Sequence, residues 1–305
     1  MSVSALQHQG RALEVLMKTS VAHLPLRAAG LAVVVAVAAS GCAASSGGGS
    51  STPSMSPLAA VKLAAKTTGQ VNSFTATMNI QITPKRGAAS SAGLSGPTQL
   101  TMTLAEQVHP SLLVSANVEL PSVGGKPTAG ELTEVVTATT MYLQWSYLTQ
   151  LLHLTKPWLA VPLSTFNKLG LNLSQVMDQA TSNGPLADSQ LLAEATSVHR
   201  VGTGSINGVP VTEYTGTIPL SSALSHFSGS LKSMVKQLET TGGITSEKFT
   251  IWVDGNNVLR KVATTAAGTD LTESSVMTIT SINKPGSISV PPASQTSALP
   301  SGALG

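Results

Sequence analysis

The chain has 305 residues, of which 42% are apolar and only 10% carry a charge, with 17 basic and 14 acidic side chains. A formal net charge of +3, without a block of lysine or arginine, lacks the electrostatic pattern of a nucleic-acid binder, so we expect no nucleic-acid partner. One cysteine allows no intramolecular disulfide, and stability must therefore come from the core.

The first 41 residues have the pattern of a signal peptide. Arg27 supplies a positive flank, and residues 28–39 follow as an uncharged apolar run. This run has the length of a signal-peptide core and is too short to span a bilayer. Met17 is an alternative start, because residues 17–41 make a more ordinary signal. The segment holds three basic residues and one acidic residue, so 14 and 13 remain after its removal.

The single cysteine, Cys42, directly follows this segment. Ala39-Ser40-Gly41-Cys42 resembles the bacterial lipobox, in which small residues let the signal peptidase cut before a lipid-modified cysteine; the usual pattern has Leu or Val where this chain has Ala39. The alternative, a free cysteine buried as a small hydrophobe, finds no core in the Ser/Gly-rich residues 42–55. We therefore predict a lipidated Cys42 on a flexible tether, exported and anchored at the outer face of the cytoplasmic membrane.

The next residues predict a helix and then an antiparallel meander. Ser56 as N-cap and Pro57 at the first helical position begin a helix through residues 58–71. Its expected apolar face is Leu58, Val61, Ala65 and Thr68. The period then changes to two, which indicates half-buried strands. They are expected at residues 74–83, 100–104, 112–120 and 135–145, with a Gly/Ser/Pro loop at residues 84–97.

The middle and the end of the chain mix helices with strands. Asn207-Gly208 between two apolar runs predicts a tight hairpin, because both residues tolerate a positive φ. Residues 221–239 have one apolar stripe and end at Gly242-Gly243, which predicts a helix. Further helices are expected at residues 164–180 and 188–195, and strands at residues 158–162, 198–203, 209–218, 248–253, 258–265 and 272–283.

No second linker divides the chain, so we expect one domain at residues 56–284 and a frayed Pro/Ser/Ala-rich tail at residues 285–305. Strands that follow one another, with helices only at the start and in the middle, do not alternate as in a parallel α/β sheet. The fold class expected is α+β, a large antiparallel sheet with a few helices packed on one face.

Motifs for catalysis are weak. The four histidines after the signal segment have no metal-binding spacing, so no metal or cofactor is expected. Ser233 and Lys236 match the Ser-x-x-Lys string of penicillin-binding enzymes, but its companion motifs are missing. The glycines of residues 202–208 lie between strands, where a hairpin explains them better than a dinucleotide loop. We predict that the chain has no catalytic residues and is not an enzyme.

Several short stretches together resemble the LppX/LprG-type lipoproteins of actinobacteria, within the LolA-like group. The resemblance covers residues 56–292, and each motif alone is weak, so it rests on their order and spacing together with the lipobox. The stretches are Met141-Tyr142-Leu143, Lys156-Pro157-Trp158, residues 208–216, residues 251–254 with 259–262, and Ile282-Asn283-Lys284-Pro285.

The resemblance implies a strongly curved antiparallel sheet, a half-barrel, with helices across its concave face and an apolar cavity between them. From this we predict a monomeric, non-enzymatic carrier that binds lipids or glycolipids by their acyl chains and moves them across the cell envelope, with a membrane exporter as a candidate partner. The alternative is an interaction or lipid-sensing module that modulates an exporter without carrying cargo; a surface hydrolase is a remote third. Four residues of the 221–239 stripe would line the cavity, although ordinary core packing explains them equally well: Leu224, Phe227, Leu231 and Met234.

The predicted anchor can be tested directly. Cys42→Ala removes the thiol that would carry diacylglycerol, and with it two acyl chains worth about 0.8 kcal/mol per buried CH₂. The variant is expected in the soluble fraction after cell lysis and centrifugation, whereas the parent chain sediments with membranes. Membrane association that is unchanged in Cys42→Ala would contradict the lipoprotein assignment.

Overall fold

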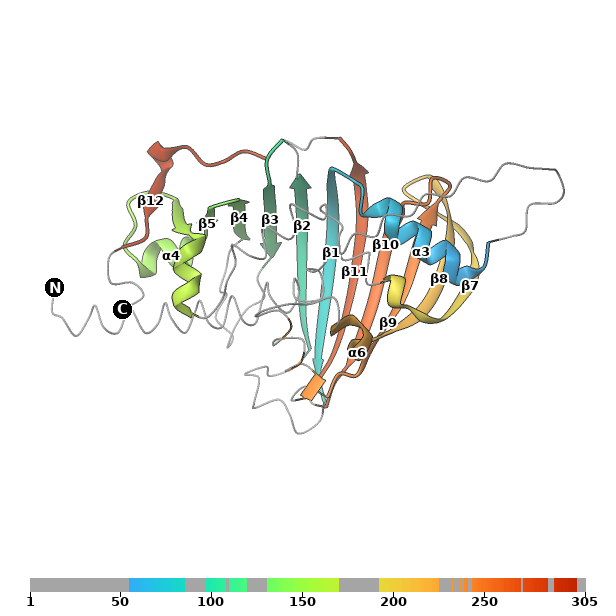
Figure 1. Ribbon diagram of the computed structural model, residues 1–305. Coiled ribbons are helices and arrows are strands. Elements are labelled where there is room, and N and C mark those ends of the chain that lie inside the picture. Colours follow the sequence, from blue (N-terminus) through green and yellow to red (C-terminus); the bar gives the residue numbers. More distant parts are fainter. Residues whose placement is uncertain are drawn as a thin grey trace.

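A computed structural model describes residues 55–85, 97–107, 110–119, 131–169, 192–224, 243–269, 271–284 and 288–300, together with residues 232, 236, 239 and 240. Of residues 167–169 and 223 only the backbone is described. The described residues contain twelve strands that form one sheet, in the order β12-β6-β5-β4-β3-β2-β1-β11-β10-β9-β8-β7 (Figure 1). Neighbouring strands are antiparallel, except for the parallel pair β12–β6.

The strands are β1 (Ser73–Pro84), β2 (Thr98–Gln107), β3 (Leu113–Glu119), β4 (Glu131–Thr137), β5 (Thr140–Gln144), β6 (Trp158–Pro162), β7 (Thr196–Ile206), β8 (Val209–Pro219), β9 (Ser246–Asp254), β10 (Leu259–Ala267), β11 (Leu271–Ile282) and β12 (Thr296–Ala298). The helices are α3 (Pro57–Thr68), α4 (Ser146–Leu151) and α6 (Leu220–Ala223), with 3₁₀ segments η1 (Leu163–Leu169) and η4 (Ala293–Gln295). This is the α+β fold expected, a large curved antiparallel sheet with few helices, and α3 lies across the side toward which β7 to β10 curl (Figure 1).

Helix α3 begins where the sequence predicts. The hydroxyl of Ser56 accepts a hydrogen bond from the backbone N–H of Ala59 at 3.3 Å, and Pro57 occupies the first turn. The helix contacts the sheet through a face of mostly small side chains, which allows a close approach to β7 and β10. That face consists of Ala60, Val61, Ala64, Ala65 and Thr68. Leu58, expected on it, is instead 38% exposed, because the buried stripe is turned toward the alanines.

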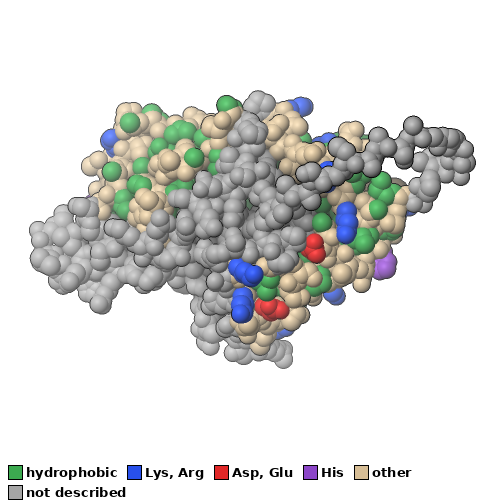
Figure 2. Space-filling view, viewed as in Figure 1, with side chains coloured by type: hydrophobic (Ala, Val, Ile, Leu, Met, Phe, Trp, Pro, Cys, Tyr) green, Lys and Arg blue, Asp and Glu red, His purple; other side chains and the backbone are tan. Residues whose placement is uncertain are grey.

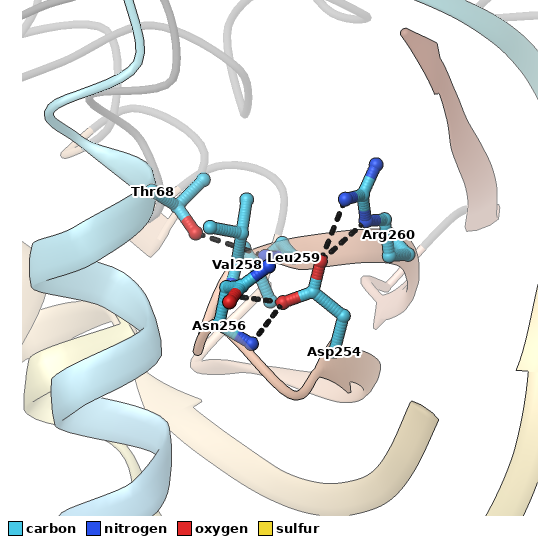
Figure 3. A network of polar contacts seen from close by, with 6 residues as sticks. All are labelled: Thr68, Asp254, Asn256, Val258, Leu259 and Arg260. Atoms are coloured by element: carbon cyan, nitrogen blue, oxygen red, sulfur yellow. Dashed lines mark hydrogen bonds and ion pairs between the residues drawn. The ribbon is translucent and has the colours of Figure 1, made fainter. Parts of the chain in front are cut away.

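The last turn of α3 is tied to the sheet by one buried hydrogen bond. Thr68 is fully buried, and its hydroxyl accepts a hydrogen bond from the backbone N–H of Leu259 at 3.0 Å (Figure 3). The bond joins residues 191 positions apart in the chain. It satisfies a backbone donor at the start of β10 that would otherwise lie buried without a partner.

The adjoining β9–β10 turn is organised by Asp254, of which only 6% is exposed. Its carboxylate accepts hydrogen bonds from the backbone N–H groups of Asn256 at 2.8 Å and Val258 at 3.0 Å. The guanidinium of Arg260 donates to the other carboxylate oxygen through Nε and Nη2, each at 2.7 Å (Figure 3). A buried carboxylate needs such partners, so the turn and the ion pair stabilise each other.

The β7–β8 hairpin confirms its sequence signal. Asn207 and Gly208 form its two-residue turn with φ of 50° and 79°, the left-handed values that a tight hairpin requires. The glycines of residues 202–208 therefore lie in this hairpin, and the dinucleotide-loop interpretation is excluded.

Two elements differ from expectation between residues 131 and 151. The run predicted as one strand is a hairpin, β4 and β5, followed directly by the unpredicted helix α4. The turn lacks Gly or Asn; instead, the hydroxyl of Thr137 accepts a hydrogen bond from the backbone N–H of Thr140 at 3.0 Å and donates to its carbonyl at 3.1 Å. Threonine turn chemistry of this kind gives a weak sequence signal.

The C-terminal segment does not fray as expected in residues 288–300. Strand β12 pairs in parallel with β6, which extends the sheet into the predicted tail. Lys156 holds this segment, because its Nζ donates hydrogen bonds to the carbonyls of Ala293 at 2.9 Å and Thr296 at 3.1 Å. The Pro/Ser/Ala-rich composition suggested a tail, but these backbone hydrogen bonds order residues 288–300.

The helices predicted in the middle of the chain are described only in part. The one expected at residues 164–180 starts as the 3₁₀ segment η1, in which Phe166 is buried. The one expected at residues 221–239 starts as α6. Residues 170–191 and most of 225–242 lie outside the described part, so the remainder of both helices stays a prediction.

The Asp254 network gives a stability prediction. Asp254→Ala should lower the free energy of unfolding by about 3 kcal/mol, because two backbone donors and a guanidinium lose a buried acceptor. Asp254→Asn keeps an amide oxygen for the backbone donors and should cost less. Urea denaturation of both variants measures the difference, and equal, small losses would show that the network is not what holds the turn.

Candidate ligand-binding face

The two faces of the sheet differ in chemistry. We call the side on which α3 lies the inner face. On β1 it carries Phe74, Ala76, Met78 and Ile80, all buried. The outer face of the same strand carries Thr and amide side chains; the hydroxyl of Thr75, for example, lies 2.8 Å from that of Thr280. The sequence alternation predicted this division.

A line of apolar side chains crosses the inner face through eight strands. At its centre three methionines are successive cross-strand partners, because Met78 pairs with Met277 of β11 on one side and Met102 of β2 on the other. We call the whole line the central row. In order from β8 to β4 it comprises Tyr214, Ile251, Val262, Met277, Met78, Met102, Val118 and Leu132.

The central row is long and adaptable. Seven strand-to-strand steps of about 4.8 Å would give it a length of about 34 Å in a flat sheet. One leaflet of acyl chains occupies about 15 Å, half of the roughly 30 Å hydrocarbon core of a bilayer. Methionine has an unbranched, polarisable side chain that fits irregular or mobile apolar partners. The middle of the row is therefore chemically suited to contact with an acyl chain, whereas Ile251 is fully buried in the core cluster.

The inner face is most tightly packed at its two ends. Under α3, a cluster centred on Phe74, Phe249 and Ile251 is almost inaccessible to solvent. At the β6 end, a second cluster includes Val161 and Phe166. Between them a small cluster is joined by partly buried side chains, and it contains Met78, Ile80 and Leu100, with Ile82, Met102, Val118 and Met277 packed against it.

Acidic side chains interrupt this apolar surface at few places. Glu247 of β9 is 6% exposed, and burial raises the pKa of its carboxyl to about 7; a hydrogen bond from Thr264 acts in the opposite direction, and the charge of Glu273 adds to the rise. Glu134 of β4 is half-buried, and loss of hydration alone raises the pKa of its carboxyl to about 7. Figure 2 shows that described charged side chains are also sparse on the viewed surface.

The residues predicted from sequence to line a cavity fall mostly outside the described part. Leu224 is half-buried and packs against the cluster under α3. Phe227, Leu231 and Met234 lie outside the described residues, as do Cys42 and Ser233. A cavity role for the four lining residues therefore stays a prediction.

Neither the central row nor the role of Glu134 was predicted from the sequence. Alternation shows that Met78 and Met102 face inward, but their alignment with Met277 depends on β1 pairing with β11. Those strands are nearly 200 residues apart, and local patterns carry no information about such a register.

Other site chemistries find no support among the described residues. They contain no group of three His, Cys, Asp or Glu side chains placed to hold a metal ion. Within the same residues, no helix combines the length and apolarity needed to cross a membrane.

Comparison with known proteins gives distant likenesses. No family model matches the chain. An uncharacterised 31.2 kDa protein from the rplA–rplJ intergenic region of Streptomyces griseus is 29% identical over 110 residues, which are 35% of this chain and 36% of that protein. The match thus spans about a third of the length of this relative.

Solved structures with a similar fold include two lipoproteins of the kind that the sequence resembles. Mycobacterium tuberculosis LppX is 16% identical, over 78% of this chain and 100% of that chain, with a TM-score of 0.44. Mycobacterium bovis LprF is 12% identical, over 79% of this chain and 99% of that chain, with a TM-score of 0.46. An outer membrane lipoprotein-sorting protein domain from Vibrio parahaemolyticus is 10% identical, over 73% of this chain and 90% of that chain, with a TM-score of 0.25.

The buried carboxyl of Glu247 predicts a pH dependence of stability. Its pKa is higher in the folded chain than in the unfolded chain, so the folded state holds the proton more tightly between pH 4.5 and about 7. The contribution of Glu247 to the free energy of unfolding is therefore complete below pH 4.5. It is lost as the pH rises through 7, by about 3 kcal/mol in total.

Glu247→Gln cannot lose a proton and should remove this part of the pH dependence, while its amide oxygen can still accept from Thr264. Urea denaturation between pH 4.5 and 8 measures the slope for the parent chain and the variant. The exposed Glu119→Gln is the control and should keep the parent slope. A parallel pH profile for Glu247→Gln would show that this carboxyl does not change protonation on folding.

Proposed function

We propose that the chain is a membrane-anchored lipoprotein that binds lipid or glycolipid acyl chains against the inner face and carries them across the cell envelope without catalysis. The observation that carries the proposal is the central row. An uninterrupted apolar line through eight strands, with three adjacent methionines at its middle, is chemically suited to hydrocarbon.

The energetics of such binding come from burial. Each CH₂ group removed from water contributes about 0.8 kcal/mol. An acyl chain with several CH₂ groups buried against the row would therefore bind without polar contacts. The mechanism would tolerate different headgroups, because the acyl chains supply most of the free energy. Tightly packed clusters at both ends of the inner face keep the sheet rigid while the middle adapts to the chain.

The predicted anchor fits the same function. A lipidated Cys42 on a tether of about 14 residues would have a typical reach of about 20 Å from the membrane. The domain would then stay near the bilayer that supplies or receives its cargo. A membrane exporter as partner and a monomeric state belong to this proposal.

Lipid carriage can be tested on the chain without residues 1–42. Native mass spectrometry and lipid extraction should find acyl lipids that copurify with the protein. If only the mass of the lipid-free protein is found, and the protein takes up no lipid from phospholipid vesicles, the alternative of an envelope interaction module without cargo is favoured.

The central row is tested by a bulky substitution within it. Met102→Trp should reduce the lipid bound per protein several-fold, because the indole fills space that the acyl chain needs, at an overpacking cost of about 1–3 kcal/mol. Thr103→Trp, next to it on the exposed outer face, is the matched control and should load normally. Thermal unfolding confirms that both variants fold, and equal loading of the two would contradict binding along the row.

A further inference from the structure

Glu134 is a polar group at an apolar position of the inner face. Its cross-strand partners are Ala116 of β3 and Leu143 of β5, and its neighbours on the same face of β4 are Leu132 and Val136. Within the described part of the chain the carboxyl has no hydrogen-bond or ion-pair partner, and loss of hydration is the one cause of its raised pKa. A carboxyl in such surroundings is costly unless something binds to it.

Trp145 presents a second polar group without a partner. It follows β5 directly, and its ring packs against the cluster at the β6 end and against Tyr147, at 5.0 Å between ring centroids. Its indole Nε1 is buried, and no acceptor for its N–H lies among the described residues. Buried donors are nearly always paired in folded proteins, so an unpaired one indicates a missing acceptor.

The register places the two groups close together. Glu134 pairs with Leu143, and Trp145 lies two residues beyond Leu143 in the chain. Leu143 and Trp145 both pack against the cluster at the β6 end, so they share the inner face. Diagonal neighbours of this kind have Cα atoms about 7–8 Å apart, a separation at which two long side chains can reach the same ligand oxygen. Leu132, where the central row ends, is two residues from Glu134 on β4.

The two groups select an oxygen acceptor. The indole N–H can only donate, and a protonated carboxyl also donates through its O–H. The inner-face positions of β1 to β6 that the structure describes carry no Lys, Arg or His, so nothing there would balance a phosphate. An uncharged carbonyl oxygen, as in the ester of an acyl chain, fits two converging donors.

We propose that Glu134 and Trp145 form a polar anchor that binds the ester carbonyl of a lipid whose acyl chain lies along the central row. The inference rests on the proposed function of the same face and adds to it a fixed end point for the ligand. It also makes binding depend on the protonation of Glu134, because an ionised carboxylate repels a carbonyl oxygen.

The charged surroundings of Glu134 are simple in the described residues. The adjoining inner-face positions of β3 and β5 carry no titratable side chain. The nearest on this face is Glu106 of β2, which takes part in a polar interaction of its own. Affinity for an ester should thus fall as the pH rises through about 7.

The test uses the full-length chain and two radiolabelled probes that differ only in the carbonyl. The protein is exposed to phosphatidylcholine vesicles that contain dioleoylglycerol or its dialkyl ether analogue, then recovered, and the bound label is counted. The parent chain should bind the ester about tenfold better than the ether at pH 6, as expected for two hydrogen bonds. This preference should shrink at pH 8.

Variants assign the preference to the anchor. Glu134→Met keeps a side chain of similar length, and Trp145→Phe keeps a smaller aromatic ring. Each loses a donor, so both should lose ester preference while ether binding is unchanged. Glu134→Gln keeps a neutral donor and should show a preference independent of pH. Glu131→Gln, exposed on the same strand, is the control.

The outcomes separate the anchor from the proposed function. Ester and ether bound equally by the parent chain, or an ester preference kept in both Glu134→Met and Trp145→Phe, would overturn the anchor while lipid binding stands. Failure of the parent chain to bind either probe would overturn lipid binding itself, and the anchor with it.

Discussion

Burial of one face of a very wide sheet is the constraint on which the rest of this structure depends. A strand that alternates apolar and polar residues is stable only when its apolar side is covered, and here most strands alternate in the same sense. Helix α3 covers the end at β7 to β10, where Thr68 and the Asp254 network fix its position against the sheet. At the other end η1 packs against β6, and β12 adds the outermost strand of the sheet. The middle of the inner face, with its methionines, is the part we assign to ligand.

Two acidic residues of the inner face, Glu134 and Glu247, differ in their surroundings, although burial raises the pKa of both carboxyls to about 7. Glu247 lies at the packed end and receives a hydrogen bond from Thr264, so the fold itself accommodates it. Glu134 lies among apolar side chains, and the described residues offer it no partner. A folded chain retains such a group at a cost in stability, which is the usual sign of a functional role.

The sequence predicted the local elements well, because their signals are local. Ser56 and Pro57 mark the start of α3, and Asn207-Gly208 marks a tight turn. It missed the β4–β5 turn, where Thr137 replaces the usual glycine, and the ordering of residues 288–300, which depends on Lys156 more than 130 residues earlier. The central row could not be predicted for the same reason, because the register between strands distant in sequence depends on the tertiary structure. Inward-facing positions were foreseeable; which of them lie side by side was not.

Methionine methyl groups offer the most direct test of the central claim, because they report contact with a ligand atom by atom. The nine methionines of the chain can be labelled with ¹³C at the methyl carbon and observed by NMR during titration with an acyl lipid. The methyl resonances of Met78, Met102 and Met277 are expected to shift, while that of Met55, which is 53% exposed before α3, should not. Unchanged resonances for the three central methionines at saturating lipid would contradict binding along the inner face.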